Sequence, residues 1–110
     1  MAQDFENVLT KIVSATTKTA INDATGSDDA IIGIRCANIL STAITVDVYI
    51  TNGGTDYYLA KDVPIPSGGS VEFIDGGAKI VVLSGDQLNA ECSDANGCDF
   101  IVSRVDTISA

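Results

Sequence analysis

Apolar and polar residues alternate along the segment from Ala43 to Asn52. Four apolar side chains occupy every second position, and mostly polar ones fill the gaps: Ile44, Val46, Val48 and Ile50 against Thr45, Asp47, Tyr49 and Thr51. A period of two places successive side chains on opposite faces of a strand. The pattern therefore predicts a half-buried antiparallel strand. The Asn52-Gly53-Gly54 run that follows predicts a hairpin turn into a returning strand over Tyr57–Val63.

Further strand-like runs follow one another at spacings of roughly ten residues. β-branched residues favour a strand from Thr10 to Ile21. For Asp4–Leu9 the pattern leaves two alternatives open, a strand or part of an amphipathic helix over Phe5–Val13. The other predicted strands are Ala30–Asn38, Ser70–Ile74, Lys79–Leu83, Gln87–Cys92 and Cys98–Ile108.

Local irregularities are predicted at three places. Gly33 marks a bulge or a close backbone approach inside its strand. Imperfect alternation around Ile101 and Val102 indicates a second bulge. Pro64 and Pro66 lack the backbone donor that a sheet ladder needs, so the chain is expected to leave the sheet there.

These short strands, with Gly-rich turns and no convincing helix of 10–15 residues between them, predict an all-β fold. We expect a single antiparallel β-sandwich, jelly-roll-like, with about eight short strands. The 110 residues fit one domain. We assign residues 10–110 to the sandwich and residues 1–9 to a flexible N-terminal arm.

Composition removes most classes of function. The chain has no His, so a Ser-His-Asp or Cys-His centre is excluded within it, and three Cys cannot form a four-cysteine zinc site. No phosphate-binding glycine motif occurs. We therefore expect no enzyme activity, no metal and no cofactor. A net charge of −9 argues against nucleic acid as a partner. No apolar run approaches the ~18 residues of a membrane span, and the acidic first residues do not resemble a secretory signal.

The three cysteines divide into a pair and a single residue. Cys92 and Cys98 flank a short loop, and a hairpin across it would bring their side chains within reach of a disulfide. A reducing cytoplasm would instead keep both as thiols, and the two alternatives stay open. Cys36 lies on the inward side of its predicted strand, where it is expected to be a small core residue.

Side chains with carboxylate or amide oxygens gather at two predicted loops. Asp94, Asn96 and Asp99 are at one, and Asp23, Asp28 and Asp29 are at the other. The first group has part of the spacing of a calcium loop but lacks its terminal bidentate Glu. For both groups we favour solvated turns over a bound ion.

Aromatic residues are the candidates for contacts between subunits. Tyr49, Tyr57 and Tyr58 are expected to lie close together across the 52–56 hairpin, and Phe5 lies in the arm. Exposed aromatic side chains are enriched in interface cores, so these four residues form a possible subunit interface. Ordinary cross-strand packing is the alternative for the tyrosines.

The order of the elements also carries a resemblance. The segments that carry it are IIGIRCAN up to Asn38, then ITVDVYIT, Tyr57-Tyr58-Leu59, Ile65-Pro66-Ser67-Gly68-Gly69-Ser70, Lys79-Ile80-Val81-Val82-Leu83, Ser84-Gly85-Asp86-Gln87-Leu88 and a last strand with Val-Ser. This string resembles the small β-sandwich virion structural proteins of tailed bacteriophages, over roughly Thr10 to Ile108. The resemblance implies a head-decoration, neck, tail or fibre-attachment component without catalytic residues.

The leading hypothesis is therefore a structural component of a tailed-phage virion that acts by protein–protein assembly. The expected partners are copies of the same chain and other virion proteins, such as the major capsid, neck or tail proteins. The alternative is a receptor- or carbohydrate-binding module on the virion that uses the loops at 52–58 and 93–99; the absence of Trp counts against sugar stacking.

Overall fold

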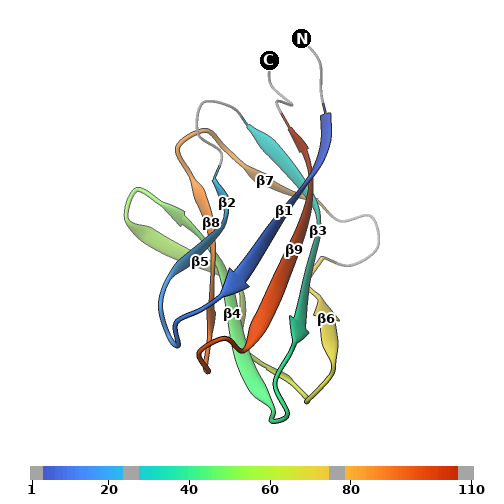
Figure 1. The fold of residues 1–110 in the computed structure, drawn as a ribbon. Helices are drawn as coiled ribbons and strands as arrows, with labels where there is room; N and C mark the ends of the chain where they lie inside the picture. The colour runs from blue at the N-terminus through green and yellow to red at the C-terminus, as the bar shows by residue number, and fades with distance from the viewer. Residues whose placement is uncertain (1–3, 24–27, 75–78, 107–110) are drawn as a thin grey trace.

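The structure is a computed structural model that describes residues 4–23, 28–74 and 79–106. It confirms the all-β prediction: the described residues form strands and connecting turns without a helix (Figure 1). The strands are β1 (Asp4–Ile12), β2 (Thr19–Asp23), β3 (Asp29–Asn38), β4 (Ile44–Asn52), β5 (Thr55–Ile65), β6 (Ser70–Glu72), β7 (Ile80–Val82), β8 (Gln87–Cys92) and β9 (Cys98–Asp106).

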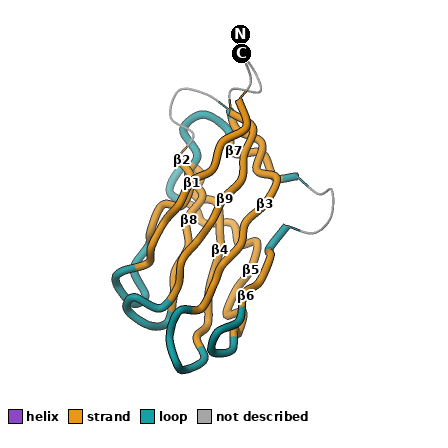
Figure 2. The backbone as a smooth tube through the Cα atoms, turned by 45° about the vertical axis from the view of Figure 1, so that its right-hand side comes forward, coloured by secondary structure: helices purple, strands orange, loops and turns teal. Residues whose placement is uncertain are grey.

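Two antiparallel sheets make up the sandwich (Figure 2). Sheet A has the order β1-β9-β3-β6, with β7 also paired to β3, and sheet B has the order β2-β8-β4-β5. Because β9 occupies one side of β3 along its length, β6 and β7 share the other side and act as one interrupted strand. With β6 and β7 counted as one strand, the pairs are β1 with β9, β2 with β8, β3 with β6/β7, and β4 with β5. This nested pairing is a jelly roll, as predicted.

The core lies between the sheets and is built from the apolar positions of the alternating strands. Its largest fully buried members outside Tyr49 come from both sheets: Phe100, Ile12, Ile31, Ile34, Val82, Ile21, Ile44, Val46, Val48, Ile65 and Leu88. Burial of apolar surface contributes about 25 cal/mol per Å², so this layer is the main source of stability. The hairpin predicted after Asn52 is confirmed, and Gly53 and Gly54 adopt the positive φ values of 57° and 83° that its turn requires.

The boundary predicted at residue 10 does not coincide with the start of the sheet. Asp4–Leu9, assigned to the arm, belong to β1 and pair with β9 in an unbroken register. The backbone pairing of β1 with β9 settles the helix-or-strand alternative for this segment in favour of a strand. In contrast, the strand predicted through Ile21 is interrupted by a turn at 13–18, where Thr16 has a φ of 52°. Residues 1–3 of the predicted arm lie outside the described residues.

The predicted irregularities are confirmed at Gly33 and Pro66 and wrong at Pro64 and around Ile101 and Val102. The register of β3 against β9 shifts between Ile31 and Gly33, as the glycine predicted. β9 itself runs past Ile101 and Val102 without a bulge, because the extra residue lies in β3. β5 continues through Pro64 to Ile65, and the chain leaves the sheet at Pro66. β5 is an edge strand, on which a residue without an N–H can be tolerated.

An ionic cluster ties the two sheets together near one end. The Arg104 guanidinium on β9 donates to Glu6 on β1 at 2.7 Å and to the side-chain oxygen of Asn22 on β2 at 2.7 Å. It also lies 3.4 Å from the buried carboxylate of Asp29 on β3. One side chain therefore joins three strands of sheet A to a strand of sheet B.

Candidate functional site

The outer face of sheet A exposes apolar side chains in cross-strand pairs. Leu9 on β1 lies opposite Ile101 on β9, and Phe5 lies opposite Val105 in the same register. Phe5 is 80% exposed, Leu9 68% and Ile101 43%. We call these four residues the sheet-A face. Apolar side chains that gather on one exposed face mark interaction sites.

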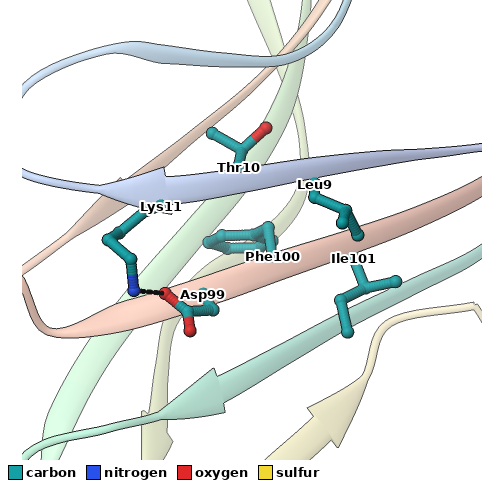
Figure 3. Close-up of a pocket in the computed structure, with 6 residues that line it drawn as sticks. All are labelled: Leu9, Thr10, Lys11, Asp99, Phe100 and Ile101. Carbon is teal, nitrogen blue, oxygen red and sulfur yellow. Dashed lines mark hydrogen bonds and ion pairs between the residues drawn. The ribbon is translucent and has the colours of Figure 1, made fainter.

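A shallow hollow of about 290 Å³ opens in this face. Leu9 and Ile101 come to it from neighbouring strands, and the Lys11–Asp99 ion pair lies at its other end (Figure 3). Its lining is the set Leu9, Thr10, Lys11, Asp99, Phe100 and Ile101. An open hollow with these walls can seat apolar side chains from another molecule.

Charges on this side of the molecule are balanced locally. Lys11 contacts Asp99 at 2.7 Å on the β1–β9 pair. Arg35 on β3 lies 3.9 Å from Glu72 on β6. Exposed ion pairs contribute little to stability, typically below about 1 kcal/mol. Because each of these two pairs is neutral as a whole, neither adds net charge to the outer surface of sheet A, although the chain carries −9.

The outer face of sheet B is different, because its side chains cover one another. Tyr49 on β4 is fully buried. The Tyr58 ring packs on it with a centroid distance of 4.8 Å, and the Lys18 ammonium lies 5.5 Å from its centroid. Its hydroxyl donates to Glu91 at 2.7 Å. Burial, and then the hydrogen bond to the Glu91 carboxylate, raise the pKa of the Tyr49 phenol.

Hydrogen bonds extend this arrangement across three strands and the loop before β2. Asn89 donates to the Thr51 hydroxyl at 2.8 Å, and Thr51 donates to Asp56 at 2.7 Å. Lys18 reaches the same carboxylate at 3.2 Å. The Thr51 hydrogen bond, and to a lesser extent Lys18, lower the pKa of Asp56. We call Lys18, Tyr49, Thr51, Asp56, Tyr58, Asn89 and Glu91 the sheet-B network.

A second hollow of about 220 Å³ lies beside this network and is polar. Within it Lys61 lies 3.3 Å from the Asp47 carboxylate, whose hydrogen bond raises the pKa of the ammonium group. Cys92 also borders it, and burial raises the pKa of that thiol to about 11. At neutral pH both groups are therefore protonated, and neither is prepared to act as a nucleophile.

The structure divides the four residues predicted to form a subunit interface between the two sheets, and in sheet B it packs Tyr58 on Tyr49 as cross-strand neighbours. Tyr49 lies on the outer face as the alternation predicted, but it is buried beneath Tyr58 and Lys18, so it is not available to another subunit. Tyr57 and Tyr58 are 59% and 48% exposed on β5, in sheet B. Phe5 is exposed on the other sheet. Sequence analysis missed Leu9, Ile101 and Val105, although the odd-numbered apolar positions of residues 5–9 and 101–105 carry the signal.

The three cysteines meet at one end of the core. All are buried free thiols, which confirms the core position of Cys36. The Cys98 thiol lies close to those of both Cys36 and Cys92. The interaction with Cys36, and then burial, raise the pKa of the Cys98 thiol. Cys92 and Cys98 are thus brought together as expected, and their oxidation to a disulfide stays a prediction.

The acidic groups and loops do not combine into a ligand site. Across residues 4–23, 28–74 and 79–106 no group of three His, Cys, Asp or Glu side chains is placed to hold a metal ion. Asp99 is engaged by Lys11, and Asp28 accepts from the Ser84 N–H at 2.7 Å. The 53–54 and 93–97 turns lie at opposite ends of the β4–β8 pair, because Thr51 faces Gln87 while Val46 faces Cys92. The two loops therefore cannot form one receptor-binding site.

Comparison of the chain with protein families, with curated proteins and with solved structures returned no match. The described part of the chain has no helix with the length and hydropathy needed to cross a membrane.

Proposed function

We propose that the protein is a structural assembly subunit that docks onto other protein chains through the sheet-A face and catalyses no reaction. The observation that carries this proposal is the two apolar cross-strand pairs, Leu9 opposite Ile101 and Phe5 opposite the half-buried Val105, on a face whose charges are locally balanced. An apolar and neutral face gains most by being covered with protein. The absence of His and the protonated state of Lys61 and Cys92 are in keeping with a role without chemistry.

The setting that we propose for this assembly is the virion of a tailed bacteriophage. Support comes from the order of elements from Ala30 onward and from the jelly-roll topology, which viral capsid proteins use among other classes. A fold alone does not define a function, so the proposal depends on the combination of topology with an uncovered apolar face. Copies of the chain and neighbouring virion proteins are the proposed partners.

Peptide mass spectrometry of gradient-purified phage particles tests the setting. We expect peptides of this chain at a copy number comparable to that of other structural proteins. Absence from particles whose host cells contain the protein would contradict the virion setting.

A pair of variants tests the face itself. Particles assembled with Leu9→Asp should lose the protein, because a charge would replace one of the most exposed apolar side chains of the sheet-A face. Thr45→Asp, on the exposed side of β4 in the other sheet, is the matched control and should be retained. Full retention of Leu9→Asp would contradict docking through the sheet-A face.

A further inference from the structure

The four sheet edges of the molecule are not equally protected against pairing with another strand. In sheet B, β2 has five residues and a register shift, and β5 carries Pro64 and a register broken twice against β4. The β6/β7 edge of sheet A consists of two strands of three residues each. Short strands, prolines and bulges are the devices that proteins use to keep sheet edges from pairing.

The β1 edge has none of these devices. β1 is nine residues long, contains no Pro or Gly, and keeps one register against β9 throughout. Among the described residues no strand pairs with its other side. Its single lysine, Lys11, is held by Asp99 on the neighbouring strand rather than standing alone at the edge. A long regular edge of this kind is a template for a further strand.

The side chains of β1 are complementary to a second copy of β1. Odd-numbered residues point outward, and Phe5 and Leu9 lie two positions on either side of Asn7. An antiparallel pair of β1 strands centred on Asn7 sets Phe5 of each copy opposite Leu9 of the other. Phe5 also lies beside Val105, and Leu9 beside Ile101. Each contact therefore becomes a row of four apolar side chains: Val105 and Phe5 of one copy, then Leu9 and Ile101 of the other.

Charge also favours a second copy over a partner of opposite charge. A basic partner would be attracted to the parts of the surface that carry the −9 net charge, whereas the sheet-A face offers it no net charge. Two acidic copies repel each other least where their charges are already paired. On the core side of the junction Glu6 is held by Arg104, so pairing brings no unpartnered carboxylate from that residue to the edge.

We propose that two copies of the chain join through antiparallel pairing of their β1 strands, centred on Asn7, so that sheet A continues from one copy into the other. This inference rests on the proposed function, because it names the partner of the same face. It differs from face-to-face docking in that the contact is made along the edge, by backbone hydrogen bonds as well as side chains.

Light scattering on a size-exclusion column measures the association. The wild-type chain is expected at twice its 11.4 kDa mass. Asn7→Lys brings two ammonium groups together at the two-fold axis. It should shift the protein to monomer, with a dimer dissociation constant at least tenfold higher than that of the wild type. Ser103→Lys is the matched control: Ser103 faces Asn7 from β9, in the same outward row but one strand away from the edge. It should leave the dimer intact.

A cross-link tests the register. Asn7→Cys, oxidised with diamide, should form a disulfide-linked dimer on a non-reducing gel, since directly opposed residues lie within disulfide reach. Lys11→Cys should not form one, because this register places position 11 of one copy opposite position 3 of the other, so that the two introduced cysteines do not meet. The native thiols are buried and do not compete.

The outcomes separate this inference from the proposed function. A wild-type monomer across the micromolar range would overturn β1 pairing, and incorporation into particles would still support docking through the face. Loss of the dimer in Ser103→Lys but not in Asn7→Lys would contradict edge pairing and indicate face-to-face contact instead. Cross-linking by Lys11→Cys in preference to Asn7→Cys would overturn the register.

Discussion

The outer faces of the two sheets differ in how far their central or apolar side chains are exposed to water. On sheet B a tyrosine in the middle of the face is fully buried, because Tyr58 and the Lys18 side chain lie over it. On sheet A the edge strand β1 exposes Leu9 and its neighbour β9 exposes Ile101. Within residues 4–23, 28–74 and 79–106, no side chain covers Leu9 and Ile101 in the way that Tyr58 and Lys18 cover Tyr49.

This difference indicates which face is complete in the single chain. In the sheet-B network the Tyr49 and Thr51 hydroxyls and the Asn89 amino group donate to other members of the network, so a partner would have to replace bonds that already exist. The sheet-A face has apolar area still in water, and covering it costs no hydrogen bond. Substitutions on the two faces should therefore act on different properties, stability on sheet B and association on sheet A.

The largest expected effect compares the two sides of one strand in sheet B. Val46→Asp places an unpaired charge in the core and should unfold the domain, because a buried carboxylate without a partner is among the most costly changes. Thr45→Asp, on the exposed side of the same strand, should change the free energy of unfolding by less than about 0.5 kcal/mol. Circular dichroism and urea denaturation measure both. Equal tolerance would mean that the register of β4 is wrong.

The second effect compares Tyr49, on an inner strand of sheet B, with Leu9, on the edge strand of sheet A. Tyr49→Ala removes the ring that Tyr58 and Lys18 cover, and should lower the free energy of unfolding by about 3 kcal/mol, as buried aromatic truncations do. Leu9→Ala should cost under about 0.5 kcal/mol in the monomer, because its side chain is exposed. The measurement is urea unfolding at a concentration low enough to keep the chain monomeric. Similar losses for the two variants would contradict the contrast between the faces.

A smaller effect isolates the polar part of the network. Tyr49→Phe keeps the ring and removes the hydrogen bond to Glu91, so it should cost about 1 kcal/mol. Tyr57→Phe, on an exposed side chain of the neighbouring strand, is the control and should be neutral within error. A neutral Tyr49→Phe would show that packing alone holds the buried ring in place.

The smallest effect is a pH dependence confined to the sheet-B network. Because the pKa of Asp56 is lower in the folded chain than its ordinary value of 3.8, its contribution to stability is present above that value and is lost as the pH falls through the folded pKa. Between pH 5 and pH 3 the wild-type melting temperature should fall slightly more than that of Asp56→Asn. Parallel melting curves for the two proteins would contradict a role for Thr51 and Lys18 in holding this carboxylate.

Local patterns were enough to predict the strands whose alternation has one interpretation. β4, the turn at Gly53-Gly54 and the irregularity at Gly33 all follow from neighbouring residues, because pleat period and glycine conformation are local properties. β1 was less certain, because Phe5, Leu9 and Val13 recur at a spacing that also suits one face of a helix. Pairing with β9, about a hundred residues away in the chain, decides between the two.

The candidate site was predictable only in part, for a related reason. Alternation placed Tyr49 on the outer face correctly, but its burial depends on Lys18 and Tyr58, which come from other strands or loops. The proximity of Cys92 and Cys98 was visible from their spacing, whereas the approach of Cys36 required the pairing of β3 with β9. Leu9 and Ile101 each look like ordinary exposed residues until that kind of pairing sets them side by side.

The sequence by itself determined that the chain is a single all-β sandwich, because strand period, turn glycines and the fraction of apolar residues are properties of short segments. Only the tertiary structure decided which outer face is covered and which edge is regular. Those properties depend on which strands become neighbours, and that choice is made by the burial of the whole core rather than by any one segment.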